Sequence, residues 1–197
     1  MRLDAVVFTV AGMAFGVILG WVIGAQQLGR ATAAAPAAGQ PAARQAPALD
    51  QARVDQLTAT VNGDPKNTTA LVQLANVYFD AERFTDAIGW YEKALALDPK
   101  NADVSTDLGV SYYYTNRTEE ALKRFEESLK IDPKHTKTLL NKGIVLAFGK
   151  EDLKAAAVEW QKVVDLAPSS PEGVAAKRAL EGVAAAVHNN QAAPNQQ

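Results

Sequence analysis

Few residues in this chain have the types and spacing that catalysis or metal binding requires. The sequence has only two histidines, His135 and His188, and neither has a partner at metal-ligand or catalytic spacing. Cysteine is absent, which excludes disulfides, thiolate nucleophiles and cysteine zinc sites. Adjacent carboxylates such as Glu126 and Glu127 follow a regular amphipathic pattern, so we interpret them as a solvated helix face rather than an acid–base pair.

Motifs that cradle phosphates or activate a nucleophile are also missing from the sequence. The triplets NTT at Asn67 and NRT at Asn116 fit the glycosylation pattern, but both fall at expected helix boundaries. Because Asn and Thr commonly cap helices, we interpret them as structural. The sequence therefore predicts a protein that is not an enzyme and binds no cofactor or metal ion.

Composition allows one moderate soluble domain besides an apolar segment. The chain has 197 residues, of which 48% are hydrophobic and 21% charged. From Asn62 to Val187, sixteen basic residues are interspersed with nineteen acidic ones. Because a basic patch is the usual footprint of nucleic-acid binding, we expect no nucleic-acid partner.

The amino-terminal segment has the pattern of a membrane anchor. No charged residue occurs from Ala5 to Gly29, and a bilayer core requires about 20 apolar residues. Glycine recurs at every fourth position, on one face of a helix, at Gly12, Gly16, Gly20 and Gly24. We therefore expect a transmembrane helix in residues 1–30, with residues 5–29 in the lipid bilayer. Its glycine stripe would let a second helix approach closely, so self-association is expected.

Two other interpretations of this segment stay open. Arg2 and the small residues ATAAAPAAG after Arg30 fit a cleaved secretory signal, which would leave a secreted binding domain. Signal cores are usually shorter, about 7 to 15 apolar residues. Glycine is also common in membrane helices, so the spacing alone does not establish a helix contact.

A tether follows the anchor. Residues 31–48 consist mainly of alanine, proline, glycine and glutamine, and their three prolines interrupt any helix. We predict a disordered linker, which reaches about 55 Å if extended. Such a length holds a domain clear of the lipid headgroups.

Beyond the tether, the sequence repeats with a fixed period. Segments that open with DPK start at Asp64, Asp98 and Asp132, which are 34 residues apart. Within each segment, apolar residues recur twice at helical spacing, on either side of a short polar break. Each segment therefore predicts a helical hairpin, and the next Asp-Pro pair ends its second helix. The predicted hairpins span about 64–97, 98–131 and 132–166.

Small and aromatic residues recur at matching positions of the three hairpins. They are Ala75, Tyr78, Ala87, Tyr91, Ala94 and Pro99, then Gly109, Tyr112, Ala121, Phe125, Ser128 and Pro133, then Gly143, Leu146, Ala156, Trp160 and Pro168. In period and in these positions, the segments resemble tetratricopeptide repeats. The third departs most, because it has one extra residue in its hairpin and Leu146 where an aromatic is usual. The early tryptophan of the family is missing from all three.

The resemblance implies an all-α solenoid whose ends are covered by further helices. We expect a repeat domain over 49–187, with a capping helix at 171–187 and a disordered tail at 188–197. Asn67 and Asn101 are placed to cap the helices that follow them. Because His135 occupies the equivalent position, we expect a turn or capping role for it rather than metal ligation.

In tetratricopeptide repeat proteins the first helix of each hairpin lines a concave groove. The matching positions here are Val72, Asn76, Phe79, Thr106, Val110, Tyr113, Tyr114, Leu140, Ile144 and Phe148. Some members of the family clamp a peptide's terminal carboxylate with Lys and Asn, but Val72, Asp107 and Leu140 stand where such donors are needed. The resemblance therefore implies a protein or peptide partner with apolar anchors, and no carboxylate clamp.

Together, the anchor and the repeats predict a membrane-bound scaffold or adaptor for protein–protein interaction. The same layout is similar to that of repeat-containing assembly chaperones of cytochrome c maturation and envelope biogenesis, which is the alternative. By that analogy we expect a bacterial inner-membrane protein with its repeat domain in the periplasm. Arg2 and Arg30 flank the apolar run nearly evenly, so charge alone leaves the orientation open.

Overall fold

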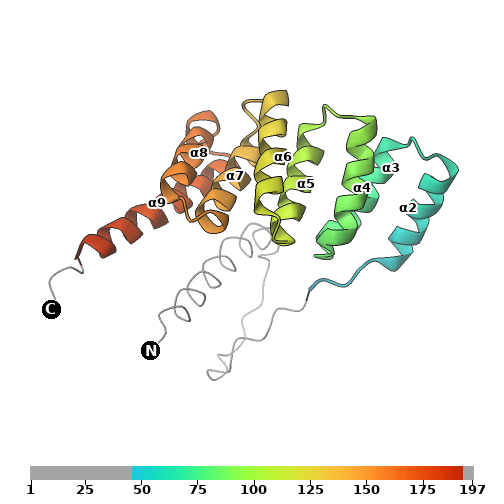
Figure 1. The fold of residues 1–197 in the computed structure, drawn as a ribbon, viewed down its shortest axis with the longest axis horizontal. Coiled ribbons are helices and arrows are strands. Elements are labelled where there is room, and N and C mark those ends of the chain that lie inside the picture. The colour runs from blue at the N-terminus through green and yellow to red at the C-terminus, as the bar shows by residue number, and fades with distance from the viewer. Residues whose placement is uncertain (1–45, 193–197) are drawn as a thin grey trace, which may run out of the picture. The chain divides into compact units, whose positions relative to one another are not determined.

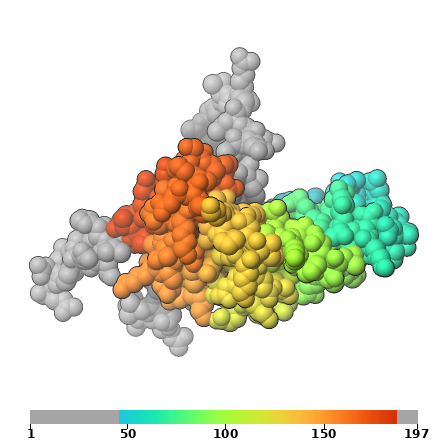
Figure 2. Space-filling view, turned by 90° about the horizontal axis from the view of Figure 1, so that it is seen from above, coloured from blue at the N-terminus to red at the C-terminus, as the bar shows by residue number. Residues whose placement is uncertain are grey.

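Three helical hairpins with a helix at either end make up the described chain. The computed structural model describes residues 46–192, with side chains as far as Ala186. The helices are α2 (Gln51–Gly63), α3 (Thr68–Asp80), α4 (Phe84–Leu97), α5 (Ala102–Tyr114), α6 (Thr118–Ile131), α7 (Thr136–Gly149), α8 (Leu153–Leu166) and α9 (Pro171–Ala192). Consecutive helices stand side by side in chain order (Figures 1 and 2), and α5 and α9 also contact α7. The expected all-α solenoid of stacked hairpins is confirmed.

The predicted transmembrane helix, its glycine stripe and most of the tether lie outside the described residues. Only residues 46–48 of the tether are described, and they adopt no helix. Among the helices between residues 46 and 192, none is both long enough and apolar enough to cross a bilayer.

Side-chain caps fix where several helices begin. Asn67 Oδ1 accepts a hydrogen bond from the Ala70 backbone amide at 2.9 Å, as predicted. Asn101 does the same for Val104 at 3.0 Å. These contacts satisfy amides in the first turn that have no partner within the helix.

The turn inside each hairpin has three residues, and its middle residue is left-handed. These residues are Glu82, Asn116 and Glu151, with φ values of 57°, 61° and 56°. The extra residue of the third hairpin lies within the first helix, since α7 has 14 residues whereas α3 and α5 each have 13. The longer third hairpin therefore keeps the same turn.

The last helix extends beyond its predicted end. α9 begins at Pro171 as expected but runs to Ala192 rather than Val187, so residues 188–192 are helical rather than part of a disordered tail. The polar residues of this stretch favour an earlier end of the helix. The stretch nevertheless contains neither proline nor glycine, the residues that would stop a helix. Gly173 brings the start of α9 close to α8, because a Cβ there would overlap the carbonyl of Ala167.

In the second and third hairpins, a glycine on the first helix approaches an aromatic ring of the second helix closely. A Cβ on Gly109 of α5 would lie 2.6 Å from Phe125 Cε1 of α6. A Cβ on Gly143 of α7 would overlap the indole of Trp160 on α8. Both rings are fully or almost fully buried. The two helices of a hairpin can pack at this distance only because the first lacks a side chain at the crossing.

A matched pair of glycine substitutions tests this packing. Gly143→Ala should lower the free energy of unfolding by about 1–3 kcal/mol, because the buried Trp160 ring must shift. Gly89→Ala lies in α4, where an added Cβ meets nothing within 4 Å, and should raise it by about 0.5–1 kcal/mol through helix propensity. Urea denaturation of both variants measures the difference. Equal effects of the same sign would contradict the close-approach account.

Candidate binding surface

The first helices of the hairpins carry a set of partly exposed side chains. Nine of the ten predicted groove residues are partly exposed on α3, α5 and α7. We call this set the inner face: Val72, Asn76, Phe79, Val110, Tyr113, Tyr114, Leu140, Ile144 and Phe148. Most of its apolar members rest on the buried core, which supports them from below. The inner face is therefore mainly apolar and aromatic, and it is anchored on packed helices.

Thr106 does not belong to this surface. Its side chain is 0% exposed, so the prediction that it lines the groove is wrong. The Thr106 hydroxyl instead lies 2.6 Å from that of Thr138 on α7 and 3.1 Å from that of Ser128 on α6. A small hydroxyl at this position lets three helices converge, and its hydrogen bonds satisfy the polar group that burial removes from water.

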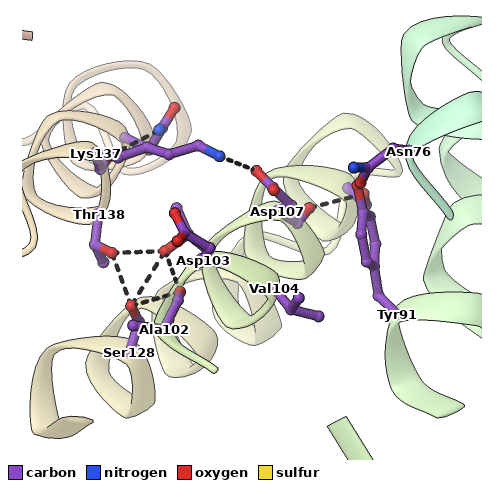
Figure 3. A network of polar contacts seen from close by, with 12 residues as sticks. Asn76, Tyr91, Ala102, Asp103, Val104, Asp107, Ser128, Lys137 and Thr138 are labelled. Carbon is purple, nitrogen blue, oxygen red and sulfur yellow. Dashed lines mark hydrogen bonds and ion pairs between the residues drawn. The ribbon is translucent and has the colours of Figure 1, made fainter. Parts of the chain in front are cut away.

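A buried cluster of three hydroxyls joins the second and third hairpins. Besides their mutual contacts, Thr106 and Ser128 both donate to the carbonyl of Ala102, at 2.7 and 2.9 Å (Figure 3). Thr138 also lies 2.6 Å from Nδ1 of His135. These contacts fix the position of α7 against α5 and α6. Sequence reasoning missed the cluster, although Ser128 occupies the small-residue position and could have indicated it.

His135 lies in the turn before α7, as predicted, but its side chain does not cap the helix. It stands at the N-cap position of α7, but its side chain makes no capping hydrogen bond. Its Nε2 lies 3.2 Å from Asp103 Oδ1, while the other ring nitrogen contacts Thr138. The two nitrogens lie on different edges of the ring, so imidazole bridges neighbouring side chains where asparagine caps a backbone amide.

Aromatic rings join the first two hairpins at one end of the inner face. Phe84 of α4 stacks on Tyr114 with ring centroids 4.4 Å apart, and it meets Phe79 edge-on at 5.3 Å. Tyr113 lies beside Tyr114 at 5.9 Å. A small cavity of about 240 Å³ opens next to this stack, lined by residues 82–86 with Tyr114 and Thr115. Phe79 and Tyr114 therefore help to hold the hairpins together as well as contributing to the surface.

A charged pair joins the second and third hairpins. Lys137 reaches from α7 to Asp107 on α5, with its Nζ 2.7 Å from Oδ1 (Figure 3). Burial raises the pKa of the Asp107 carboxyl above its ordinary value, and the charge and hydrogen bond of Lys137 offset only part of this effect. The environment of Asp107 thus disfavours its negative charge even with the lysine present.

The buried phenol of Tyr91 lies beside Asn76 of the inner face. Tyr91 of α4 donates a hydrogen bond to Asn76 Oδ1 at 2.7 Å. Burial raises the pKa of Tyr91, and the negative charges of Asp107 and Asp80 raise it further. Sequence reasoning noted Asp107 only as the lack of a clamp donor and did not consider Asp80.

A second ion pair lies between α7 and α8. Glu159 is 7% exposed and meets Nζ of Lys142 at 3.1 Å and Nζ of Lys162 at 2.9 Å. Burial raises the pKa of Glu159, but the hydrogen bonds from Lys162 and Lys142 outweigh it and leave the pKa below its usual value. Lys142 is therefore engaged within the third hairpin.

Within the described residues, no group of three or more His, Cys, Asp or Glu side chains is arranged to hold a metal ion.

Comparison with known protein families identifies this architecture. Two sequence profiles described as tetratricopeptide repeat match residues 67–134 and 106–171, which together span all three hairpins. The chain belongs to the tetratricopeptide repeat family. The resemblance inferred from the recurring small and aromatic residues is confirmed. No curated protein matched in a sequence search.

Solved tetratricopeptide repeat structures share the fold. MamA has 15% identity and a TM-score of 0.56, covering 70% of this chain and 88% of that chain. The first repeat domain of Spaghetti, solved bound to the HSP90 peptide SRMEEVD, has 22% identity and a TM-score of 0.56, covering 64% and 96%. The Sgt2 domain from Aspergillus fumigatus has 22% identity and a TM-score of 0.58, covering 66% and 85%. At these identities the similarity establishes the fold alone.

Removing Lys137 tests the electrostatics of the inner face. Lys137→Met leaves Asp107 without its cation, so the free energy of unfolding at pH 7 should fall by about 1–2 kcal/mol. Because the pKa of Asp107 is already raised and rises further without Lys137, acidification protonates the carboxyl in the folded state. The loss should therefore shrink as the pH falls below that raised pKa.

Urea denaturation at pH 7 and near pH 4 measures this effect. The control is Lys154→Met on the exposed face of α8, which should change stability little at either pH. A loss for Lys137→Met that is the same at both pH values would contradict the role assigned to Asp107.

Proposed function

We propose that this tetratricopeptide repeat protein is a membrane-anchored adaptor, without catalytic activity, that binds a protein segment along its inner face. The observation that carries the proposal is the partly exposed apolar surface on α3, α5 and α7. The packing contacts of these helices run to hairpin partners, to adjacent hairpins and to the terminal helices.

The inner face offers two features that suit a peptide ligand. Val72, Val110 and Ile144 supply apolar surface on three successive helices, so an extended or helical segment crossing them gains contacts on each. The packed helices beneath hold these side chains in place, which reduces the entropy lost on binding. The similar Spaghetti domain was solved with a bound peptide, which supports this mode of recognition.

Membrane attachment is the second part of the proposal. The uncharged run from Ala5 to Gly29 is long enough to cross a bilayer, and the Ala/Pro-rich tether separates it from the repeats. We place the repeat domain on the periplasmic side of a bacterial inner membrane. Anchoring confines the adaptor and a membrane-bound partner to two dimensions, which raises their effective concentration.

An assembly chaperone of the envelope type is the alternative function, because the same order of anchor, tether and repeats serves it equally well. An adaptor copurifies with one folded complex, whereas a chaperone holds unfolded clients briefly. Native mass spectrometry of the detergent-solubilised protein separates the two. A single complex of defined mass supports the adaptor, and a heterogeneous set of transient clients supports the chaperone.

Charge insertion into the inner face tests the binding surface. The double variant Val110→Arg/Leu140→Arg places two cations on α5 and α7, and it should reduce partner recovery from native membrane extracts at least tenfold. The matched control is Val158→Arg on α8, a residue that is 57% exposed outside the inner face, and it should bind normally. Circular dichroism checks that each variant is folded. Unchanged recovery by a folded double variant would refute the inner face as the binding site.

Removal of the amino-terminal segment tests the anchor. The full chain should sediment with membranes and resist extraction by alkaline carbonate, because its apolar run stays in the lipid. A chain lacking residues 1–30 should appear in the supernatant. If the full chain is itself extracted by carbonate, the anchor is absent or has been removed.

A further inference from the structure

The two junctions between the hairpins differ in chemistry. At the first junction, Phe84 of α4 stacks on Tyr114 of α5 with ring centroids 4.4 Å apart. Buried apolar residues of α2 to α6, such as Tyr91 and Leu108, form one core cluster across this junction. The first two hairpins are therefore joined by apolar packing, which is lost only when buried surface meets water.

The second junction, where α5 and α6 meet α7, is largely polar. The Thr138 hydroxyl lies 2.6 Å from that of Thr106 and 2.8 Å from that of Ser128, and all three are buried (Figure 3). Among the described residues, three contacts between ionisable side chains also cross it: Lys137–Asp107, His135–Asp103 and Lys150–Glu119. In each of these contacts one side chain is at least 42% exposed, so water screens the attraction.

The apolar core is divided at the same place. Apart from Val145, the buried apolar residues of α7, α8 and α9 form a second, smaller cluster: Leu139, Ala147, Ala156, Trp160, Val163 and Ala176. Some apolar contact does cross the junction, since Val145 of α7 packs into the first cluster and Leu129 of α6 packs against the second. The helices α7–α9 nevertheless have a core of their own.

Unfolding of α7–α9 alone costs less than unfolding within α3–α6. It breaks the second junction, whose hydrogen bonds and partly exposed ion pairs give small net contributions because the freed groups bind water. It exposes the smaller cluster and Val145, while the cluster of α2–α6 otherwise stays packed. Unfolding within α3–α6 would break the larger cluster instead.

We propose that α7, α8 and α9 unfold and refold together as one unit at the second junction while the first two hairpins stay folded. The inner face is then complete only when this unit is folded, because Leu140, Ile144 and Phe148 lie on α7. A partner segment that contacts Val110 and Leu140 together would hold the unit folded. That consequence rests on the proposed function, whereas the unfolding of the unit does not.

Native-state hydrogen exchange of the full chain in mild detergent tests the inference. Exchange is followed by mass spectrometry of peptides at urea concentrations below the main unfolding transition. Amides of α7 and α8 should exchange at least ten times faster than those of α4 and α5. Their rates should also converge on one common urea dependence, because every amide of a cooperative unit is exposed by the same opening.

Two variants that lack a buried hydroxyl separate unfolding of the unit from global unfolding. Thr138→Val removes a hydroxyl that crosses the second junction, so exchange should rise at least threefold in α7–α8 and in α4–α5 alike. Ser105→Ala is the matched control, because the Ser105 hydroxyl donates to the carbonyl of Arg124 within the second hairpin, which stays folded when the unit opens. It should speed exchange in α4–α5 at least threefold and leave α7–α8 unchanged.

The exchange of α7 and α8 decides the inference. Equal rates throughout α3–α8, or equal acceleration of α7–α8 by both variants, would show that the hairpins unfold as one body and would overturn it. Neither result bears on partner binding, which the Val110→Arg/Leu140→Arg variant tests separately.

Discussion

The structure depends on the close approach of a residue without a side chain to a large ring across the second and third hairpins. Gly109 faces Phe125 and Gly143 faces Trp160, and neither ring could keep its place against a larger neighbour. A lone hairpin leaves an apolar side exposed to water, so the hairpins must also stack on one another.

Stacking uses most, but not all, of each first helix. One side of α5 packs on α6, and its flanks meet α4 and α7. What is left becomes the inner face, whose side chains are only partly covered. The hydroxyl cluster around Thr106 and the Lys137–Asp107 pair fix the third hairpin against the second, so they define the geometry of that surface. The same contacts therefore stabilise the fold and set the geometry of the inner face.

The pattern of residues in the sequence predicted the fold well and the inner face less well. The 34-residue period and the Asp-Pro pairs gave the hairpins, because helical spacing and proline act locally. The burial of Thr106 and the bridging role of His135 depend on three helices meeting, which no local signal encodes. The Lys137–Asp107 pair was missed for a similar reason. The two residues are 30 positions apart in the sequence, and only the folded chain brings them together.

Site-specific photocrosslinking in native membranes tests the central claim, partner binding along the inner face, most directly. A benzophenone amino acid replaces Val110 on α5 in one chain and Val158 on α8 in another, and both are illuminated in intact membranes. The account predicts a discrete crosslinked adduct with one partner from position 110 and none from position 158. Adducts from position 158 alone, or the same adducts from both positions, would contradict it.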